Sequence, residues 1–394
     1  MQSTVTGQSD SPKLAGDPIK PAARFAMVDG LRGLAALGIA VYHIWRYQPA
    51  LKSDPLVFPA IEFVPEFVDW MFRKSWVGVQ LLLVISGFVI AFTLRNTWVT
   101  PREVLSFVAR RMFRLWPPYA VTILFSAFLL AVCESWWGMP PPVGEPLTIS
   151  RVLAHLGFLQ EVLGETPLTA AIWTVCIEMQ FYVVSVVGWG LAQRLCARPD
   201  PLQPRPSGWG ALLVFAPLAL AALLVWNTQE STEPWVIHFL NAFFLGMVTW
   251  WTLDGTVSPR VFAVTVAVVA AHLAFQWKLE NALALTAALV IYFAGRTDHF
   301  HDWLNWRWLQ YLGRISYSLY LIHYPVSHVL TWIGWRWCDG SPTPAQACLI
   351  LFGCLVASII SGHLLYVCVE TPSGRCSAWL KNRHGRIVTV PNHE

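Results

Sequence analysis

The sequence predicts an all-α membrane protein, a polytopic bundle of about ten transmembrane helices with both termini in the cytoplasm. Composition is the first observation behind this fold class: 55% of the 394 residues are hydrophobic and 13% are charged, which is about half the charged fraction of a soluble domain. The second observation is that many apolar segments reach the roughly 17–25 residues that a helix needs to cross a bilayer. The third is an uneven distribution of Lys and Arg between the loops on the two sides.

Ten segments are predicted to cross the bilayer, and they form one continuous membrane domain. Only Lys278 and Glu280 interrupt the apolar run between the seventh and the eighth. The segments lie at 30–47, 76–94, 114–134, 170–193, 209–226, 235–252, 260–277, 280–296, 311–334 and 346–369. We therefore expect a polar N-terminal tail at 1–28, a transmembrane domain at 29–372 and a cytoplasmic C-terminal tail at 373–394.

The loop charges predict the orientation. With the N-terminus inside, 20 of the 27 Lys and Arg residues fall on the cytoplasmic side and 7 on the outside, as the positive-inside rule requires. The longest outer loops are then 48–75 and 135–169, and the second contains helical periodicity at 151–164, which Ser150 could cap. A net charge of +4 without a dense basic tract gives no reason to expect a nucleic-acid partner.

The first predicted span, which begins "DGLRGLAALGIAVYH" (29–43), carries ionisable residues where plain apolar helix is expected. Arg32 and His43 are eleven residues apart, so they share a helix face about 16 Å apart along the axis. Asp29 lies close to that face. An arginine at a helix end often snorkels to the interface, whereas a histidine at membrane depth usually faces a bundle interior or a polar cavity. His43 is therefore a candidate functional group, with a structural role as the alternative.

A cluster of arginines precedes the third predicted span, in "FVARRMFRLWPPY" (107–119). Arg111 and Arg114 share a face by their i,i+3 spacing. Such a pair can bind phosphate groups bidentately. The alternative is ordinary positive-inside charge, which we prefer for Arg110.

A third candidate is Glu178 in "IWTVCIEMQFY" (172–182), an apolar run that also contains Tyr182. A buried carboxylate needs a partner, which His43 or an arginine of another helix would supply. A purely structural ion pair is the alternative.

A fourth stretch, "GRISYSLYLIHYP" (313–325), places His323 at mid-depth before Pro325. His323 could handle protons together with His43, but a packing histidine is the preferred interpretation. Glu370 ends the last predicted span, where we expect a structural or interfacial role.

Five motifs in this order resemble the acyltransferase family 3 of integral-membrane acyltransferases. The family pattern has an arginine and, after ten residues, a histidine in the first helix, then a "GV-LFFVLSGF" run, an arginine pair before the third helix and two aromatic-rich segments. The matching stretches here are Arg32 and His43, "GVQLLLVISGF" (78–88), Arg111 and Arg114, "WTVCIEMQFY" (173–182) and "ISYSLYLIHYP" (315–325). The resemblance covers about 29–372, nearly the whole chain.

The resemblance implies acyl transfer, most often of acetyl, from acyl-CoA to a hydroxyl of a surface glycan, a lipid-linked sugar or a similar glycosylated acceptor. It implies a stand-alone enzyme of the bacterial inner membrane, without an extracytoplasmic hydrolase-like domain. His43 would be the general base, oriented by Glu178 or Asp29. The cofactor-binding residues would be the arginines Arg32, Arg111 and Arg114, and further site residues would be His323 and Tyr182. No metal is expected.

Two alternatives remain at this point. A proton-coupled secondary transporter would also carry buried His, Glu and Arg in its helices, although we find no inverted repeat in the sequence. An acyltransferase that modifies a small molecule such as a macrolide would share the same motifs.

Overall fold

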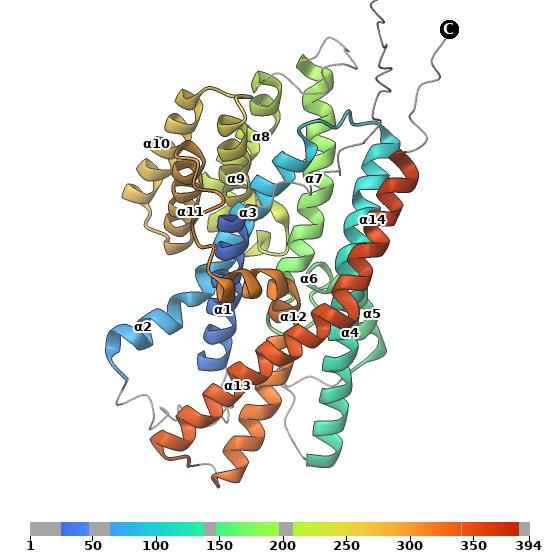
Figure 1. Cartoon of the computed structure of the whole chain (residues 1–394), viewed down its shortest axis with the longest axis vertical. Coiled ribbons are helices and arrows are strands. Elements are labelled where there is room, and N and C mark those ends of the chain that lie inside the picture. The colour runs from blue at the N-terminus through green and yellow to red at the C-terminus, as the bar shows by residue number, and fades with distance from the viewer. Residues whose placement is uncertain (1–24, 47–63, 138–146, 197–207, 340, 386–394) are drawn as a thin grey trace, which may run out of the picture.

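The computed structural model describes residues 25–46, 64–137, 147–196, 208–339 and 341–385 (Figure 1). These residues form helices joined by turns, and no strand occurs among them, so the all-α prediction is confirmed. The α-helices are α1 (Ala26–Arg46), α2 (Glu66–Lys74), α3 (Gly78–Leu94), α4 (Pro101–Trp137), α5 (Ile149–Leu156), α6 (Gln160–Leu163), α7 (Trp173–Cys196), α8 (Gly208–Leu224), α9 (Leu240–Leu253), α10 (Pro259–Phe275), α11 (Leu279–Arg296), α12 (Arg307–Trp337), α13 (Pro344–Leu365) and α14 (Thr371–Gly385). The short elements between them are the 3₁₀ turns η1 (Ser75–Val77), η2 (Trp226–Thr228), η3 (Glu230–Thr232) and η4 (Val236–Phe239) and the π-helical segment η5 (Tyr366–Glu370).

All ten predicted spans are helical. Eight of the described helical stretches are long and apolar enough to cross a membrane: 26–45, 66–94, 101–132, 173–195, 208–228, 236–253, 279–296 and 344–378. The two other predicted spans correspond to α10, which is a shorter apolar helix, and to α12. Helix α12 has 31 residues, but it buries polar side chains such as Ser316, Ser318 and His323, which lower its apolar character.

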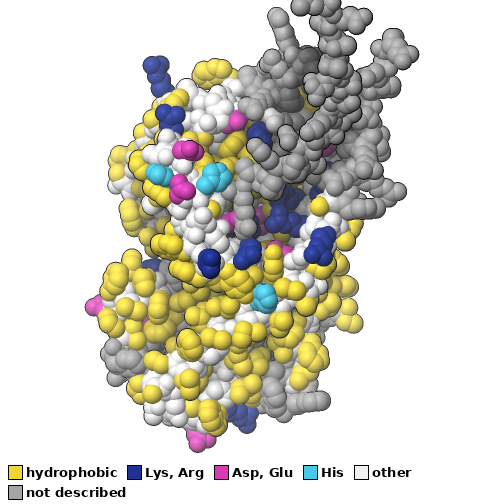
Figure 2. Space-filling view, in the orientation of Figure 1, with side chains coloured by type: hydrophobic (Ala, Val, Ile, Leu, Met, Phe, Trp, Pro, Cys, Tyr) yellow, Lys and Arg dark blue, Asp and Glu magenta, His cyan; other side chains and the backbone are white. Residues whose placement is uncertain are grey.

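Large apolar side chains remain exposed on the outward faces of these helices. Phe128 on α4, Leu220 on α8 and Phe352 on α13 are examples. Figure 2 shows hydrophobic side chains gathered over the lower half of the molecule, where α12 and α13 lie. A continuous apolar surface of this kind fits contact with lipid, because water would disfavour it.

Glycine allows two pairs of helices to approach closely. A Cβ atom on Gly313 of α12 would overlap the carbonyl oxygen of Asp29 on α1, and one on Gly246 of α9 would overlap the carbonyl oxygen of Val84 on α3. Small residues at such crossings let helix backbones pack directly in a membrane, where van der Waals contact rather than water exclusion drives association. The α1–α12 crossing holds Arg32 and His43 against the helix that carries His323.

Helix α4 begins at Pro101, well before the predicted start at 114, and continues through Pro117 and Pro118. A proline has no N–H, so Pro118 leaves the carbonyl oxygen of Arg114 without its usual helical donor. The hydroxyl of Ser373 on α14 donates to this oxygen at 3.3 Å, and the hydroxyl of Ser377 donates to the carbonyl oxygen of Arg110 at 2.8 Å. Side chains of α14 thus support the helical turn that presents the arginine pair.

The predicted C-terminal tail is helical as far as it is described. Segment η5 and helix α14 continue α13 to Gly385, where a tail was predicted from 373. The physical reason is the packing of α14 along α4, which the sequence pattern alone does not display. The structure does not describe residues 386–394, residues 1–24 of the predicted N-terminal tail or most of the linker at 198–208. Helix α1 begins at Ala26, within the range predicted for the N-terminal tail.

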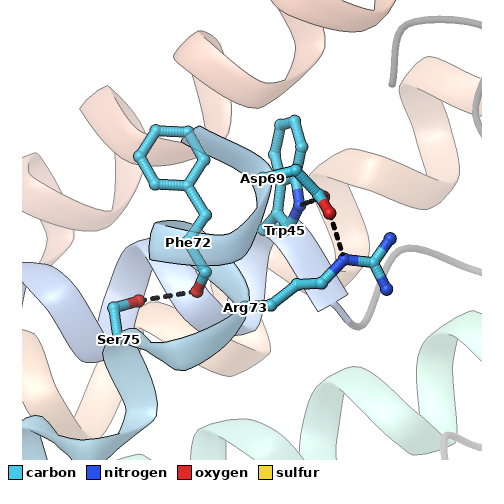
Figure 3. Close-up of polar contacts among 5 residues, drawn as sticks. All are labelled: Trp45, Asp69, Phe72, Arg73 and Ser75. Atoms are coloured by element: carbon cyan, nitrogen blue, oxygen red, sulfur yellow. Dashed lines mark hydrogen bonds and ion pairs between the residues drawn. The ribbon is translucent and has the colours of Figure 1, made fainter. Parts of the chain in front are cut away.

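The predicted outer loop 48–75 contains α2, which the close-up shows beside the end of α1 (Figure 3). The indole N–H of Trp45 donates to Asp69 Oδ1 at 2.8 Å, and Arg73 Nε donates to Asp69 Oδ2 at 2.7 Å. The hydroxyl of Ser75 donates to the carbonyl oxygen of Gly38 at 2.8 Å. These contacts hold the last turns of α1, which carry His43, against the segment that leads into α3.

The predicted helix at 151–164 is instead two short helices, α5 and α6, and its cap is Thr148 rather than Ser150.

Burial lowers the pKa of His155 to about 4, so its ring is neutral at neutral pH. Its Nδ1–H points at the carbonyl oxygen of Arg151 at 2.6 Å, and its Nε2 accepts from the backbone N–H of Leu168 at 3.0 Å. This contact fixes the segment that precedes α7.

Candidate active site

A cavity of about 120 Å³ lies between α1, α3, α4, α7, α12 and η5. Its walls combine apolar side chains, mostly of α3, with polar and charged groups from all six elements. The polar groups are Arg32, Ser86, Arg111, Arg114, Thr174, Glu178, Tyr182, Ser316, Tyr317, Tyr320 and Glu370. The fold therefore brings five of the predicted site residues, Arg32, Arg111, Arg114, Glu178 and Tyr182, into one cavity.

Three guanidinium groups face this cavity from two helices. Arg32 on α1 and Arg111 on α4 are half-buried, and Arg114 on α4 is exposed. The guanidinium carbon of Arg111 lies 5.0 Å from the ring centroid of Tyr182. Within the described part of the chain, no hydrogen bond or ion pair involves the three guanidiniums. Since like charges in a partly buried site repel one another, an anion that binds between them would be strongly favoured.

Glu178 faces the same cavity from α7. Its Oε1 accepts hydrogen bonds from Ser86 Oγ at 3.3 Å and from the hydroxyl of Tyr182. Its side chain and those of Arg114 and Arg32 all act electrostatically on Arg111. Among the described residues, the hydrogen-bond partners of this carboxylate are thus two hydroxyl groups. The sequence had suggested His43 or an arginine of another helix.

Glu370 is a cavity residue that the sequence reasoning placed at the end of the last helix with a structural or interfacial role. Its side chain is buried, with 8% exposed, and its Oε2 accepts a hydrogen bond from Ser318 Oγ at 2.6 Å. It lies in η5, and the extra residue per turn of a π-helix redirects the side chains that follow it. Such segments occur often at functional sites, and sequence periodicity does not reveal them.

His43 and His323 form a buried pair where α1 crosses α12. His43 Nδ1 lies 2.9 Å from the carbonyl oxygen of Ile39 and 3.0 Å from Nε2 of His323. Nδ1 of His323 lies 3.0 Å from the carbonyl oxygen of Leu319. A carbonyl oxygen only accepts, so both Nδ1 atoms are assigned the hydrogen. His43 Nδ1–H can then donate to His323 Nε2, and the neutral His43 ring carries its lone pair on Nε2.

The histidine pair lies beside the cavity rather than in the wall that is described. Its connection to the wall is Tyr320, whose ring centroid is 6.1 Å from that of His323 and whose hydroxyl hydrogen-bonds to Thr174. Arg32 lines the cavity about 16 Å along α1 from His43. The cavity wall therefore includes both the arginines and Tyr320, whose ring is the neighbour of His323.

Asp29 lies in the first turn of α1 and is not among the described residues that line the cavity. Fourteen residues of continuous helix separate it from His43, which corresponds to about 21 Å. Asp29 is therefore too distant to orient the His43 ring. In the structure, His323 and the carbonyl oxygen of Ile39 are among the groups that hold this ring.

Sequence reasoning also missed the hydroxyl groups of the cavity. Ser86, Thr174, Tyr317 and Tyr320 line it, and all four lie in the stretches that resemble the family motifs. The available signal was spacing: Ser316 and Tyr320 lie seven and three residues before His323, so they share its side of α12.

Comparison with known proteins identifies relatives over most of the chain. A family model described as "Acyltransferase domain" matches residues 25–363. One relative is a candidate membrane-bound transacylase, BcsY, from Komagataeibacter xylinus, which is 24% identical over 366 residues, covering 87% of this chain and 81% of the relative. Another is a candidate acetyltransferase, ORF330, from Acidianus two-tailed virus, which is 24% identical over 224 residues, covering 56% of this chain and 54% of that protein. No solved structure matches the chain significantly.

Proposed function

Since the chain belongs to the acyltransferase family whose model it matches, and is a membrane acyltransferase, we propose that it transfers an acyl group, acetyl foremost, from acyl-CoA to a hydroxyl of a glycan, a lipid-linked sugar or a similar glycosylated acceptor. The observation that carries this proposal is the convergence of three guanidiniums in a cavity whose wall residue Tyr320 lies next to a buried histidine pair. Membership of a family of acyltransferases argues against a transporter.

The cationic end of the cavity suits the donor. Coenzyme A carries several phosphate charges, and guanidinium groups bind phosphates through paired N–H donors. In this proposal Arg111, Arg114 and Arg32 hold the phosphates, and the narrow pantetheine arm runs along the cavity toward Tyr320. Glu178 balances part of the positive charge, so the three arginines can stay close together before the donor binds.

His43 is proposed as the general base. A neutral imidazole with its lone pair on Nε2 can accept the proton of the acceptor hydroxyl while the hydroxyl oxygen bonds to the thioester carbonyl carbon. The carbon–sulfur bond then breaks, and the CoA thiolate takes the proton back from the imidazolium. His323 is a positioning residue, because it accepts from His43 Nδ1–H and thereby keeps the lone pair on Nε2.

The proposal includes an orientation in the membrane. With both termini in the cytoplasm, as the loop charges favour, Arg111 and Arg114 lie toward the cytoplasmic end of α4 and acyl-CoA enters from the cytoplasm. The acceptor then approaches from the outer side or within the outer leaflet. A bacterial inner membrane is the setting that this arrangement suits.

The experiment that tests the proposed function follows thiol release by the purified protein in lipid nanodiscs supplied with acetyl-CoA and a panel of glycosides. Release should rise with an acceptor and should yield an acylated glycoside. In sealed vesicles with membrane-impermeant acetyl-CoA outside, inside-out vesicles should consume it and right-side-out vesicles should not. Consumption by right-side-out vesicles alone would overturn the orientation, and the absence of any acetyl-CoA turnover would overturn the activity.

Replacing Glu178 by Gln should lower the rate of acyl transfer about tenfold while the thermal stability stays near that of the wild type. The amide keeps the shape and can still accept from Tyr182 and Ser86, but it loses the charge that offsets Arg111; a tenfold change corresponds to about 1.4 kcal/mol. Transfer rate and thermal unfolding should be measured together. Glu233→Gln, which removes an exposed carboxylate outside the cavity, is the control. A loss of stability with normal specific activity would show that Glu178 has a structural role only.

A further inference from the structure

The cavity of the candidate active site, at about 120 Å³, is too small for a complete acyl-CoA molecule. A space of this size takes on the order of ten water molecules, which suits a narrow chain such as the pantetheine arm. The nucleotide of coenzyme A is bulkier, and its ribose carries a 3′-phosphate in addition to the diphosphate that leads to the arm. If the arginines of the cavity hold the diphosphate, the 3′-phosphate must lie outside, on the surface around the mouth of the cavity.

Arg314 on α12 lies at this mouth. It comes three residues before Tyr317 and four before Ser318, so all three share one side of the helix, with Arg314 one turn nearer its N-terminal end. The hydroxyl of Tyr317 donates to the carbonyl oxygen of Leu115 on α4 at 2.8 Å, and that of Ser318 donates to Glu370 Oε2 at 2.6 Å. Leu115, Tyr317 and Glu370 all line the cavity. Arg314 is therefore one helical turn beyond the edge of the cavity wall.

The guanidinium of Arg314 is available to bind an anion. The residue is exposed, and no hydrogen bond or ion pair of Arg314 occurs in the part of the chain that the structure describes. A helical side chain leans toward the N-terminal end of its helix, so the guanidinium extends away from the cavity and, in the proposed orientation, toward the cytoplasm. The described charged residues that line the cavity are three arginines and two carboxylates, so Arg314 adds to an excess of positive charge at this end. Figure 2 shows Lys and Arg side chains in a band across the middle of the visible face.

We propose that Arg314 binds the 3′-phosphate of the donor and thereby selects coenzyme A over carriers that end in the same thiol but lack this phosphate. The inference rests on the proposed function, because it assigns a second phosphate site to the donor of that reaction. A phosphate monoester carries between one and two negative charges at neutral pH, and a guanidinium can present two parallel N–H donors to it. No bond is made or broken at this site, so Arg314 is a specificity residue and not a catalytic one.

The test compares the binding of acetyl-CoA and of acetyl-3′-dephospho-CoA to the full chain in lipid nanodiscs at low, constant ionic strength. The two ligands differ only in the 3′-phosphate, so the ratio of their dissociation constants measures its contribution. The wild type should bind acetyl-CoA about three- to tenfold more tightly, a modest factor because water and salt screen an exposed charge. Arg314→Ala should lose this preference by weakening acetyl-CoA binding alone, and Arg314→Lys should retain part of it.

Two further variants separate this effect from others. Arg296→Ala removes an exposed arginine from the end of α11, which the predicted topology also places on the cytoplasmic side and which contributes no described residue to the cavity. This variant should keep the wild-type preference. Arg111→Ala should weaken the binding of both ligands alike, because both carry the diphosphate. A wild type that binds the two ligands equally, or an Arg314→Ala protein that keeps the preference, would overturn the inference.

An Arg314→Ala protein that loses affinity for both ligands to the same extent would also overturn it, because Arg314 would then act on the fold, on a lipid phosphate or on the diphosphate. The proposed function fails in a different way. If the wild type binds neither ligand and releases no thiol from acetyl-CoA, the proposed donor is wrong. Equal binding of both ligands instead leaves the proposed acyl transfer in place and removes only the 3′-phosphate site.

Discussion

Replacing His43 by Ala is expected to lower the rate of acyl transfer by about 10²–10⁴-fold, the contribution that a positioned general base usually makes. A hydroxyl group is a weak nucleophile at neutral pH, and in this proposal Nε2 of His43 removes its proton. Membrane insertion and thermal stability should change little, because alanine fits the α1 helix and removes no charge. The measurement is the transfer rate at saturating acetyl-CoA, together with the affinity for acetyl-CoA, which should stay near the wild-type value.

Two comparisons make the His43 result specific. His363→Ala removes an exposed histidine from α13, which is not among the described residues that line the cavity, and should leave the rate unchanged. His323→Ala removes the acceptor of His43 Nδ1–H but keeps the base, so its rate should fall less than that of His43→Ala. Near-normal transfer by a correctly inserted His43→Ala protein would remove His43 from the mechanism.

The fold was predictable because its strongest signals are local. Apolar segments of the right length located a helix at each of the ten predicted spans, and eight of the described helical stretches are long and apolar enough to cross a membrane. The loop charges favoured one orientation. The departures come from tertiary packing. Helix α4 starts at Pro101 and passes through Pro117 and Pro118 because α14 supplies a donor to the freed carbonyl oxygen of Arg114. The α14 helix itself forms where a tail was expected, because it packs along α4.

The site was predictable in its residues but less so in their pairing. Charged residues inside apolar segments identified Arg32, Glu178 and the arginine pair of α4, because such residues are rare unless they have a role. Their partners depend on which helices cross. His323, which the sequence favoured as a packing residue, is a partner of His43 in the structure. Among the described residues, the hydrogen-bond partners of Glu178 are hydroxyl groups. A three-dimensional contact of this kind leaves no periodic trace in one sequence.

The arginine pair gives the second large expected effect. Arg111→Ala and Arg114→Ala should each weaken acyl-CoA binding about tenfold or more, because each removes a charge-assisted phosphate contact of about 1.5–3 kcal/mol. The double variant should lose still more, although the two losses need not add, since both groups contact the same anion. Equilibrium binding of acetyl-CoA at constant ionic strength is the measurement, because salt screens exposed charges such as Arg114.

The neighbouring Arg110 provides the control for this pair. It lies on the same helix, but its guanidinium donates to Ser106 and is not among the described groups that line the cavity. Arg110→Ala should therefore keep the donor affinity, whereas Arg111→Lys should recover only part of it, because an ammonium group cannot present two parallel donors. If all three alanine variants bind acetyl-CoA normally and differ only in the amount of inserted protein, the arginines serve to orient the helix in the membrane. A loss of acetyl-CoA affinity in Arg111→Ala and Arg114→Ala alone instead requires a binding site for phosphate. The three positive charges on this helix contribute equally to its orientation, but only Arg111 and Arg114 face the cavity.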